Sequence, residues 1–157
     1  MTTFEEILAR DGKLVYKTRG RSMEPLLRQN RDLVIIRTPD GRLKPNDVAL
    51  YRRREQYVLH RVIEAMTDHY LIRGDNTYTL EKVPDCAVIG VMTGFRRKGK
   101  EYAVTDESYQ RYVKFWNAIY PVRFVVYRII RTAKTAARKA GLTPLIKKCI
   151  SNNHNPQ

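Results

Sequence analysis

Short runs of β-branched and aromatic residues, separated by turn-forming sequences, constrain the fold of this chain more than any other feature. The runs lie at 13–17, 33–37, 48–52, 57–64, 69–73 and 87–95. Between them stand sequences rich in Gly, Pro, Asn and Asp, at 39–41, 44–47, 74–76 and 97–99. Because strands at near-regular spacing favour antiparallel pairing, we expect a mainly β fold, either a small, coiled antiparallel sheet or a partial barrel. A short helix at 3–10, with Thr3 and Glu6 spaced as a capping box, should precede the first strand.

Charge divides the chain into two parts. From Glu107 onward the sequence holds ten Lys or Arg residues against one acid, so this part carries +9 of the total +14. We therefore predict a domain at 1–105 and a basic, amphipathic helical region at 106–157.

Helical spacing predicts the structure of the second part. Its apolar residues before Pro121 recur at helical intervals: Tyr109, Tyr112, Val113, Trp116, Ile119 and Tyr120. Pro121 should kink or divide the helix. The aromatic stripe could pack on the sheet with its basic face in water. Alternatively it could lie on an anionic membrane surface, with Tyr112, Trp116, Ile119 and Tyr120 on the lipid side.

Composition argues against several other classes of protein. The chain is 43% hydrophobic and 29% charged, a globular balance. Cys86 and Cys149 lack metal-ligand spacing, and no phosphate-binding glycine loop is present, so we expect no metal and no organic cofactor. The acidic start at 2–6 does not look like a secretion signal, which favours the cytoplasm with optional membrane association. Positive charge alone would support only sequence-independent nucleic-acid binding.

A nucleophile, a base and an acid follow one another along the first part. Ser22 stands in the run 20–25, His60 in 59–63 and Asp75 in 73–76. A serine hydroxyl attacks well only when an imidazole removes its proton and a carboxylate holds that imidazole in the right tautomer. Each residue alone can be explained by a structural role without catalysis: Ser22 and Asp75 as turn residues, and His60 as a histidine packed in the core. Their joint occurrence predicts a catalytic site.

Together these segments resemble the signal peptidase I family, within the larger group that also contains self-cleaving repressors. The matching boxes are 22–25, 46–48, 60–62 and 74–76, and the resemblance spans about 14–95. Histidine at the base position is similar to the archaeal and endoplasmic-reticulum branch, which uses a Ser-His pair with nearby acids. That branch has a second acid six residues after Asp75, which here is Glu81.

The resemblance implies a serine endopeptidase that removes a leader or signal segment from another polypeptide. Ser22 would attack, His60 would act as the base, and Asp75, or secondarily Glu81, would orient His60. Met23 and Pro25, beside the nucleophile, would contact the substrate. The competing hypotheses are a non-catalytic peptide-binding protein and a basic membrane or nucleic-acid adaptor.

Two departures from the family pattern give further expectations. Asn46 replaces the usual glycine of the second box, and little is lost because Asn also tolerates left-handed backbone. Gly20 stands where some members have an oxyanion-binding hydroxyl. Backbone N–H groups near Ser22 should therefore hold the oxyanion. A spanning helix is not expected in residues 1–20, which carry several charges.

Overall fold

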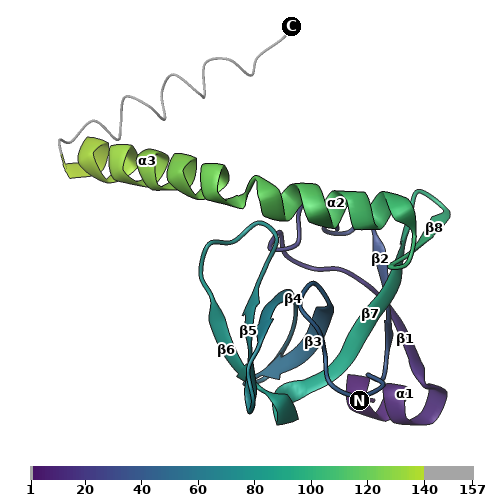
Figure 1. Cartoon of the computed structure of the whole chain (residues 1–157). Helices are drawn as coiled ribbons and strands as arrows, with labels where there is room; N and C mark the ends of the chain where they lie inside the picture. The colour runs from purple at the N-terminus through teal and green to yellow at the C-terminus, as the bar shows by residue number, and fades with distance from the viewer. Residues whose placement is uncertain (1, 140–157) are drawn as a thin grey trace, which may run out of the picture. The chain divides into compact units, whose positions relative to one another are not determined.

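A computed structural model describes residues 2–139 (Figure 1). Cys149 and the basic residues beyond 139 lie outside the described residues. The chain divides into two compact units, of which the first ends at Trp116 and the second begins at Asn117. The division falls after Trp116 rather than near 105, because Tyr109 and Val113 are buried in the core of the first unit.

The first unit is built on an open antiparallel sheet. Its strands are β1 (Lys13–Lys17), β2 (Leu33–Arg37), β3 (Val48–Arg53), β4 (Gln56–Ala65), β5 (His69–Arg73), β6 (Glu81–Pro84), β7 (Val88–Arg97) and β8 (Lys100–Ala103). They lie in the order β1-β2-β7-β3-β4-β5-β6, and β8 pairs with the long central strand β7 (Figure 1). The expectation of a mainly β, antiparallel fold is confirmed at this level.

Two strands escaped the sequence analysis for a physical reason. β6 has one buried residue, Val83, and ends at a proline, while β8 is a short, polar edge segment. Neither carries the alternating apolar pattern that predicts a strand. They form because β5 and β7 offer unpaired backbone groups beside them.

Helix boundaries follow the expected local signals. α1 (Phe4–Asp11) begins at the Thr3 cap, where the Glu6 N–H donates to Thr3 Oγ1 and the Thr3 N–H donates to the Glu6 carboxylate, as the capping box predicts. The single 3₁₀ turn η1 (Asp85–Ala87) joins β6 to β7. α2 (Glu107–Ala118) and α3 (Tyr120–Lys139) are separated at Ile119, just before Pro121. Pro121 therefore lies in the first turn of α3, where its missing N–H costs little.

Two apolar clusters fill the first unit. One joins α1, β1, β2 and β7 with Tyr109 and Val113 of α2, and it includes Met23, Leu26 and Leu27 from the loop after β1. The other lies across β3 to β6 and includes Tyr51, Val62 and Ile72. Of the two interpretations of the 109–120 stripe, packing on the sheet is confirmed for Tyr109 and Val113.

Candidate active site

Ser22 lies in the loop between β1 and β2, and the turn after β5 holds this loop in place. The Asn76 N–H donates to the Ser22 carbonyl at 2.7 Å, and Asn76 Nδ2 donates to the Arg21 carbonyl at 3.2 Å. Met23, directly after the serine, is buried in the core. The first and last boxes of the sequence, more than fifty residues apart, are thus joined by hydrogen bonds.

Gly74 brings Ser22 and His60 close together. A Cβ atom at this position would lie 2.7 Å from the Ser22 carbonyl oxygen and 3.1 Å from His60 Nε2. The 2.7 Å distance to a backbone oxygen is shorter than real Cβ atoms show, so any residue other than glycine would force the loop at Ser22 to shift. Ser22 and the Nε2 side of His60 are therefore neighbours above Gly74, although no hydrogen bond joins the two residues among those of the described chain.

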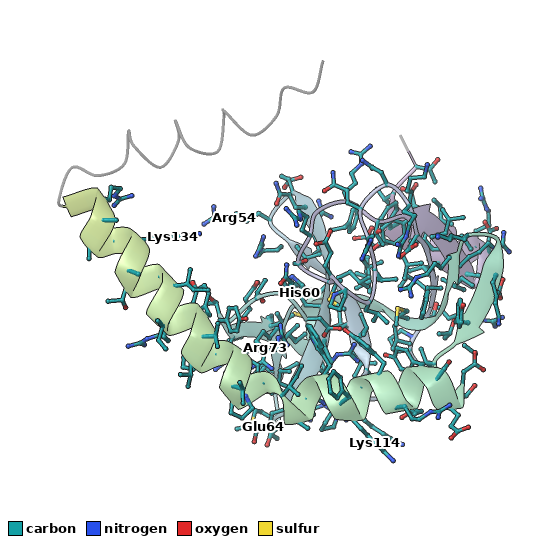
Figure 2. All side chains as sticks on the ribbon, turned by 90° about the horizontal axis from the view of Figure 1, so that it is seen from above. Arg54, His60, Glu64, Arg73, Lys114 and Lys134 are labelled. Carbon is teal, nitrogen blue, oxygen red and sulfur yellow. The ribbon has the colours of Figure 1, made fainter. Side chains whose placement is uncertain are left out.

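His60 lies within β4, opposite Ala49 of β3, and is only 5% exposed (Figure 2). Its Nδ1 atom lies 3.1 Å from the Tyr51 hydroxyl and 3.5 Å from a carboxylate oxygen of Glu81. The Tyr51 hydroxyl donates its one proton to Glu81 at 3.0 Å. It can therefore only accept from His60, so this network assigns the imidazole proton to Nδ1 and leaves the lone pair on Nε2, toward Gly74.

Tyr51 is a site residue that the sequence analysis missed. In the β3–β4 register it stands two residues from Ala49, the partner of His60, so the two side chains share one face of the sheet. Burial is the main cause that raises the pKa of Tyr51, so the hydroxyl stays protonated at neutral pH. Successive side chains of the run 48–52 point to alternate faces of the sheet. Tyr51 could therefore be identified as a neighbour of His60 only with knowledge of the β3–β4 register.

Asp75 is engaged by Arg61, the residue beside His60. Arg61 Nε donates to Asp75 Oδ1 at 2.7 Å, and Arg61 Nη2 donates to Oδ2 at 2.8 Å, with both side chains buried. Glu81, in contrast, approaches the His60 ring and also pairs with Arg53 at 3.0 Å. The geometry therefore favours Glu81 over Asp75 as the acid that orients His60, and the order expected from the sequence is reversed.

Arg61 also hydrogen-bonds to the second box, at 46–48, and to α2. Arg61 Nη1 donates to the Asn46 carbonyl at 2.9 Å and to the Tyr109 hydroxyl at 3.1 Å. Asn46 adopts φ +81°, a left-handed backbone that asparagine tolerates.

Tyr112 and Trp116, two residues of the aromatic stripe, also hydrogen-bond to Asp75. The Tyr112 hydroxyl donates to Asp75 Oδ2 at 2.8 Å, and Trp116 Nε1 donates to the Asp75 carbonyl at 3.0 Å. Tyr112 and Trp116 thus contact the turn after β5, which favours the packed alternative over the lipid-facing one for these two residues.

The electrostatic surroundings keep His60 neutral. Burial lowers its pKa below the ordinary value of 6.5, while Glu81 opposes this shift, Arg53 adds to it, and Asp75 opposes it weakly. A neutral imidazole at physiological pH can accept a proton, which is the state a general base requires.

A groove of about 1130 Å³ contains both Ser22 and His60. Its walls include Tyr16 and Lys17 of β1 and the segment 56–60 of β4. Among the described residues β1 pairs only with β2, and β5 pairs with β4 only from Arg61 onward, so two unpaired strand edges border the groove. Met23 is among the residues that line the groove, whereas Pro25 is exposed and is not among them.

Backbone donors are available beside the serine. Within the hydrogen bonds of residues 2–139, the N–H groups of Ser22 and Met23 donate to no protein acceptor. Gly20, with φ +81°, forms the bend just before them. These donors could stabilise negative charge on an oxygen near Ser22 without a side-chain hydroxyl.

No protein-family model matches the chain, and no curated protein matches it significantly. The geometry of the groove, together with the sequence resemblance, therefore has to support any functional proposal.

The Glu81 assignment predicts a measurable shift in the titration of His60. Glu81→Gln removes the carboxylate charge that raises the pKa of His60, so the midpoint should move to lower pH than in the wild type. NMR titration of the histidine ring protons measures this midpoint without any substrate. Glu64→Gln serves as the control: it removes an exposed carboxylate from β4, the strand that carries His60, and should leave the midpoint of His60 unchanged. An unchanged or higher midpoint in Glu81→Gln would remove Glu81 from this role.

Proposed function

We propose that this protein is a serine endopeptidase of the signal-peptidase type, built on the open sheet described above. The observation that carries the proposal is the arrangement around Gly74. The Ser22 carbonyl oxygen and His60 Nε2 both lie close to Gly74, and Ser22 and His60 line the same groove. Nδ1 of His60 lies beside the Tyr51 hydroxyl and the Glu81 carboxylate. A serine near a histidine that has a neighbouring acid is the combination that nucleophilic catalysis uses, and this supports the proposal.

The chemistry that follows is acyl transfer in two steps. Ser22 Oγ attacks the carbonyl carbon of the scissile peptide bond as its proton passes to His60 Nε2. The resulting oxyanion accepts hydrogen bonds from the N–H groups of Ser22 and Met23. His60 then gives the proton to the departing amine, which leaves an ester on Ser22. Water, deprotonated by His60, hydrolyses that ester and restores the serine.

Glu81 and Tyr51 act on this reaction through His60. When His60 gains a proton, the imidazolium is stabilised by the carboxylate of Glu81, directly and through the Tyr51 hydroxyl. Arg53 pairs with the same carboxylate and holds it in place. These residues position the base and do not touch the substrate.

The unpaired edges of β1 and β4 support an extended polypeptide as the substrate. A peptide between them could hydrogen-bond through its own backbone, which gives affinity with little dependence on sequence. That the substrate is a leader or signal segment comes from the family resemblance alone.

A non-catalytic peptide-binding protein is the second candidate. It is favoured by one observation, the lack of a hydrogen bond between Ser22 and His60 in the described chain. The same observation is compatible with a peptidase, because the hydrogen bond between a catalytic serine and its base is often long in a free enzyme and tightens only when substrate binds.

Exposure of the protein to a mixture of unstructured synthetic peptides separates the two candidates. Mass spectrometry should find new internal termini with the wild type and none with Ser22→Ala. Ser108→Ala removes the other serine of the described residues and should cleave as the wild type does. Peptide binding without cleavage by the wild type would establish the second candidate.

A further inference from the structure

α3 presents a continuous apolar stripe along one side. Val122, Val125, Val126, Ile129 and Ile130 recur at the intervals i, i+3, i+4, i+7 and i+8 and are between 47% and 66% exposed. Ala133, Ala136 and Ala137 extend the same side. We call Val122, Val125, Val126, Ile129 and Ile130 the α3 stripe. A soluble helix rarely leaves so many large aliphatic side chains in water on one face.

The opposite side of α3 is strongly basic. Its cations include Arg128, Arg131, Lys134 and Arg138, all exposed, and the helix contains no acid. With 100° of rotation per residue, these side chains lie across the helix from the α3 stripe. A helix with one aliphatic face and one cationic face is suited to a surface that is apolar inside and negative outside.

We propose that α3 lies on anionic lipid bilayers, with the α3 stripe inserted among the acyl chains and the cations at the headgroup phosphates. This proposal goes beyond the proposed peptidase activity and does not depend on it. Among residues 2–139, every helix is too short or too polar to span a bilayer. Insertion parallel to the surface needs no such length, because the backbone of the helix satisfies its own hydrogen bonds.

The charge of α3 favours a lipid surface over two other possible partners, a second copy of α3 and a nucleic acid. A second copy of α3 would bring a second cationic helix, and the like charges would repel one another. A nucleic acid would neutralise the cations but would leave the α3 stripe in water. An anionic bilayer satisfies both faces at once.

Three matched double variants of the full chain test the two faces separately. Val125→Gln with Ile129→Gln removes the centre of the stripe and keeps the charge. Arg131→Gln with Lys134→Gln removes two cations and keeps the stripe. Thr132→Gln with Thr135→Gln places the same two amides on the same helix outside the stripe and serves as the control. Each protein is sedimented with vesicles of phosphatidylglycerol and phosphatidylcholine, and with phosphatidylcholine alone.

The wild type and the control should bind the phosphatidylglycerol vesicles strongly at low salt and less at high salt, because salt screens the attraction. The stripe variant should bind about tenfold more weakly or worse, since burial of one large aliphatic side chain is worth about that factor. The charge variant should lose roughly fivefold for each cation removed and depend less on salt. Cleavage of a peptide without vesicles should not change in the stripe variant.

Three results would overturn the proposal. The wild type could stay in the supernatant at low salt. In the second, the stripe variant sediments as the wild type does, the charge variant does not, and an oligonucleotide displaces the protein from the vesicles. The cations alone would then account for binding, and a nucleic acid would be the better candidate for the partner. Finally, the wild type could form a dimer without vesicles that the stripe variant cannot form, which would make the stripe an interface between copies.

Discussion

His60→Ala should lower peptide cleavage by about four orders of magnitude or more, and Ser22→Ala should do the same, because the two residues act as one unit. Without the imidazole the serine keeps its proton, and without the serine the imidazole has no nucleophile to activate. Cleavage rates on the most rapidly cut synthetic peptide measure the loss. Circular dichroism should show that both variants remain folded.

His69→Ala is the matched control for this experiment. His69 is the first residue of β5, where its ring contacts the Asp68 carboxylate, and it does not line the groove. Its loss should leave cleavage per folded molecule within about twofold of wild type, because His69 lies away from the groove. A His60→Ala protein with wild-type turnover would show that another group is the base.

Asp75→Asn should mainly unfold the protein rather than disable its chemistry. The substitution leaves the buried guanidinium of Arg61 without its charged partner, and breaking a buried pair in this way costs about 3–5 kcal/mol. Urea denaturation should therefore show a much lower free energy of unfolding. This expectation reverses the one drawn from the sequence, in which Asp75 orients the base.

Glu81→Gln provides the contrast on the other acid. Its partner Arg53 is half exposed, so the free energy of unfolding should fall by about 1 kcal/mol or less. Turnover per folded molecule should fall more in Glu81→Gln than in Asp75→Asn, because a carboxamide cannot stabilise the imidazolium. If Asp75→Asn keeps its stability and loses turnover, the orienting role returns to Asp75.

The local features of the fold could be predicted because each rests on neighbouring residues. The bounds of β1, β2 and β5 follow their apolar runs without error. The cap at Thr3 and the helix break before Pro121 are equally local. The left-handed backbone that Asn46 adopts is likewise one that asparagine tolerates better than most residues other than glycine.

The choice between the two acids could not be made from spacing along the chain. His60 and Arg61 are adjacent in β4, and adjacent strand residues point to opposite faces of a sheet. An acid bonded to Arg61 therefore lies on the face away from the one His60 shares with Tyr51. Sequence motifs give the order of the boxes, but only strand register gives the face on which each side chain lies.

The faces of α3 were likewise hidden in the sequence analysis. The segment 122–130 is apolar in sequence apart from Arg123 and Arg128, and as a linear run it does not divide into two faces. The helical period of α3 places Arg128 across the helix from the α3 stripe, whereas Arg123 lies at the edge of the stripe beside Ile130. Tyr112 and Trp116 precede the break at Ile119, and their bonds to Asp75 assign them to the first unit.

Phosphonylation by a serine-reactive phosphonate probe, in which Ser22 Oγ displaces the leaving group from phosphorus, shows whether His60 activates Ser22. The full-length protein is treated near neutral pH, digested and mapped by mass spectrometry, with His60→Ala treated in parallel. We expect a single adduct on Ser22 in the wild type, none at Ser108, and a loss of labelling in His60→Ala. Labelling of Ser108 instead, or equal labelling of Ser22 with and without His60, would contradict this expectation.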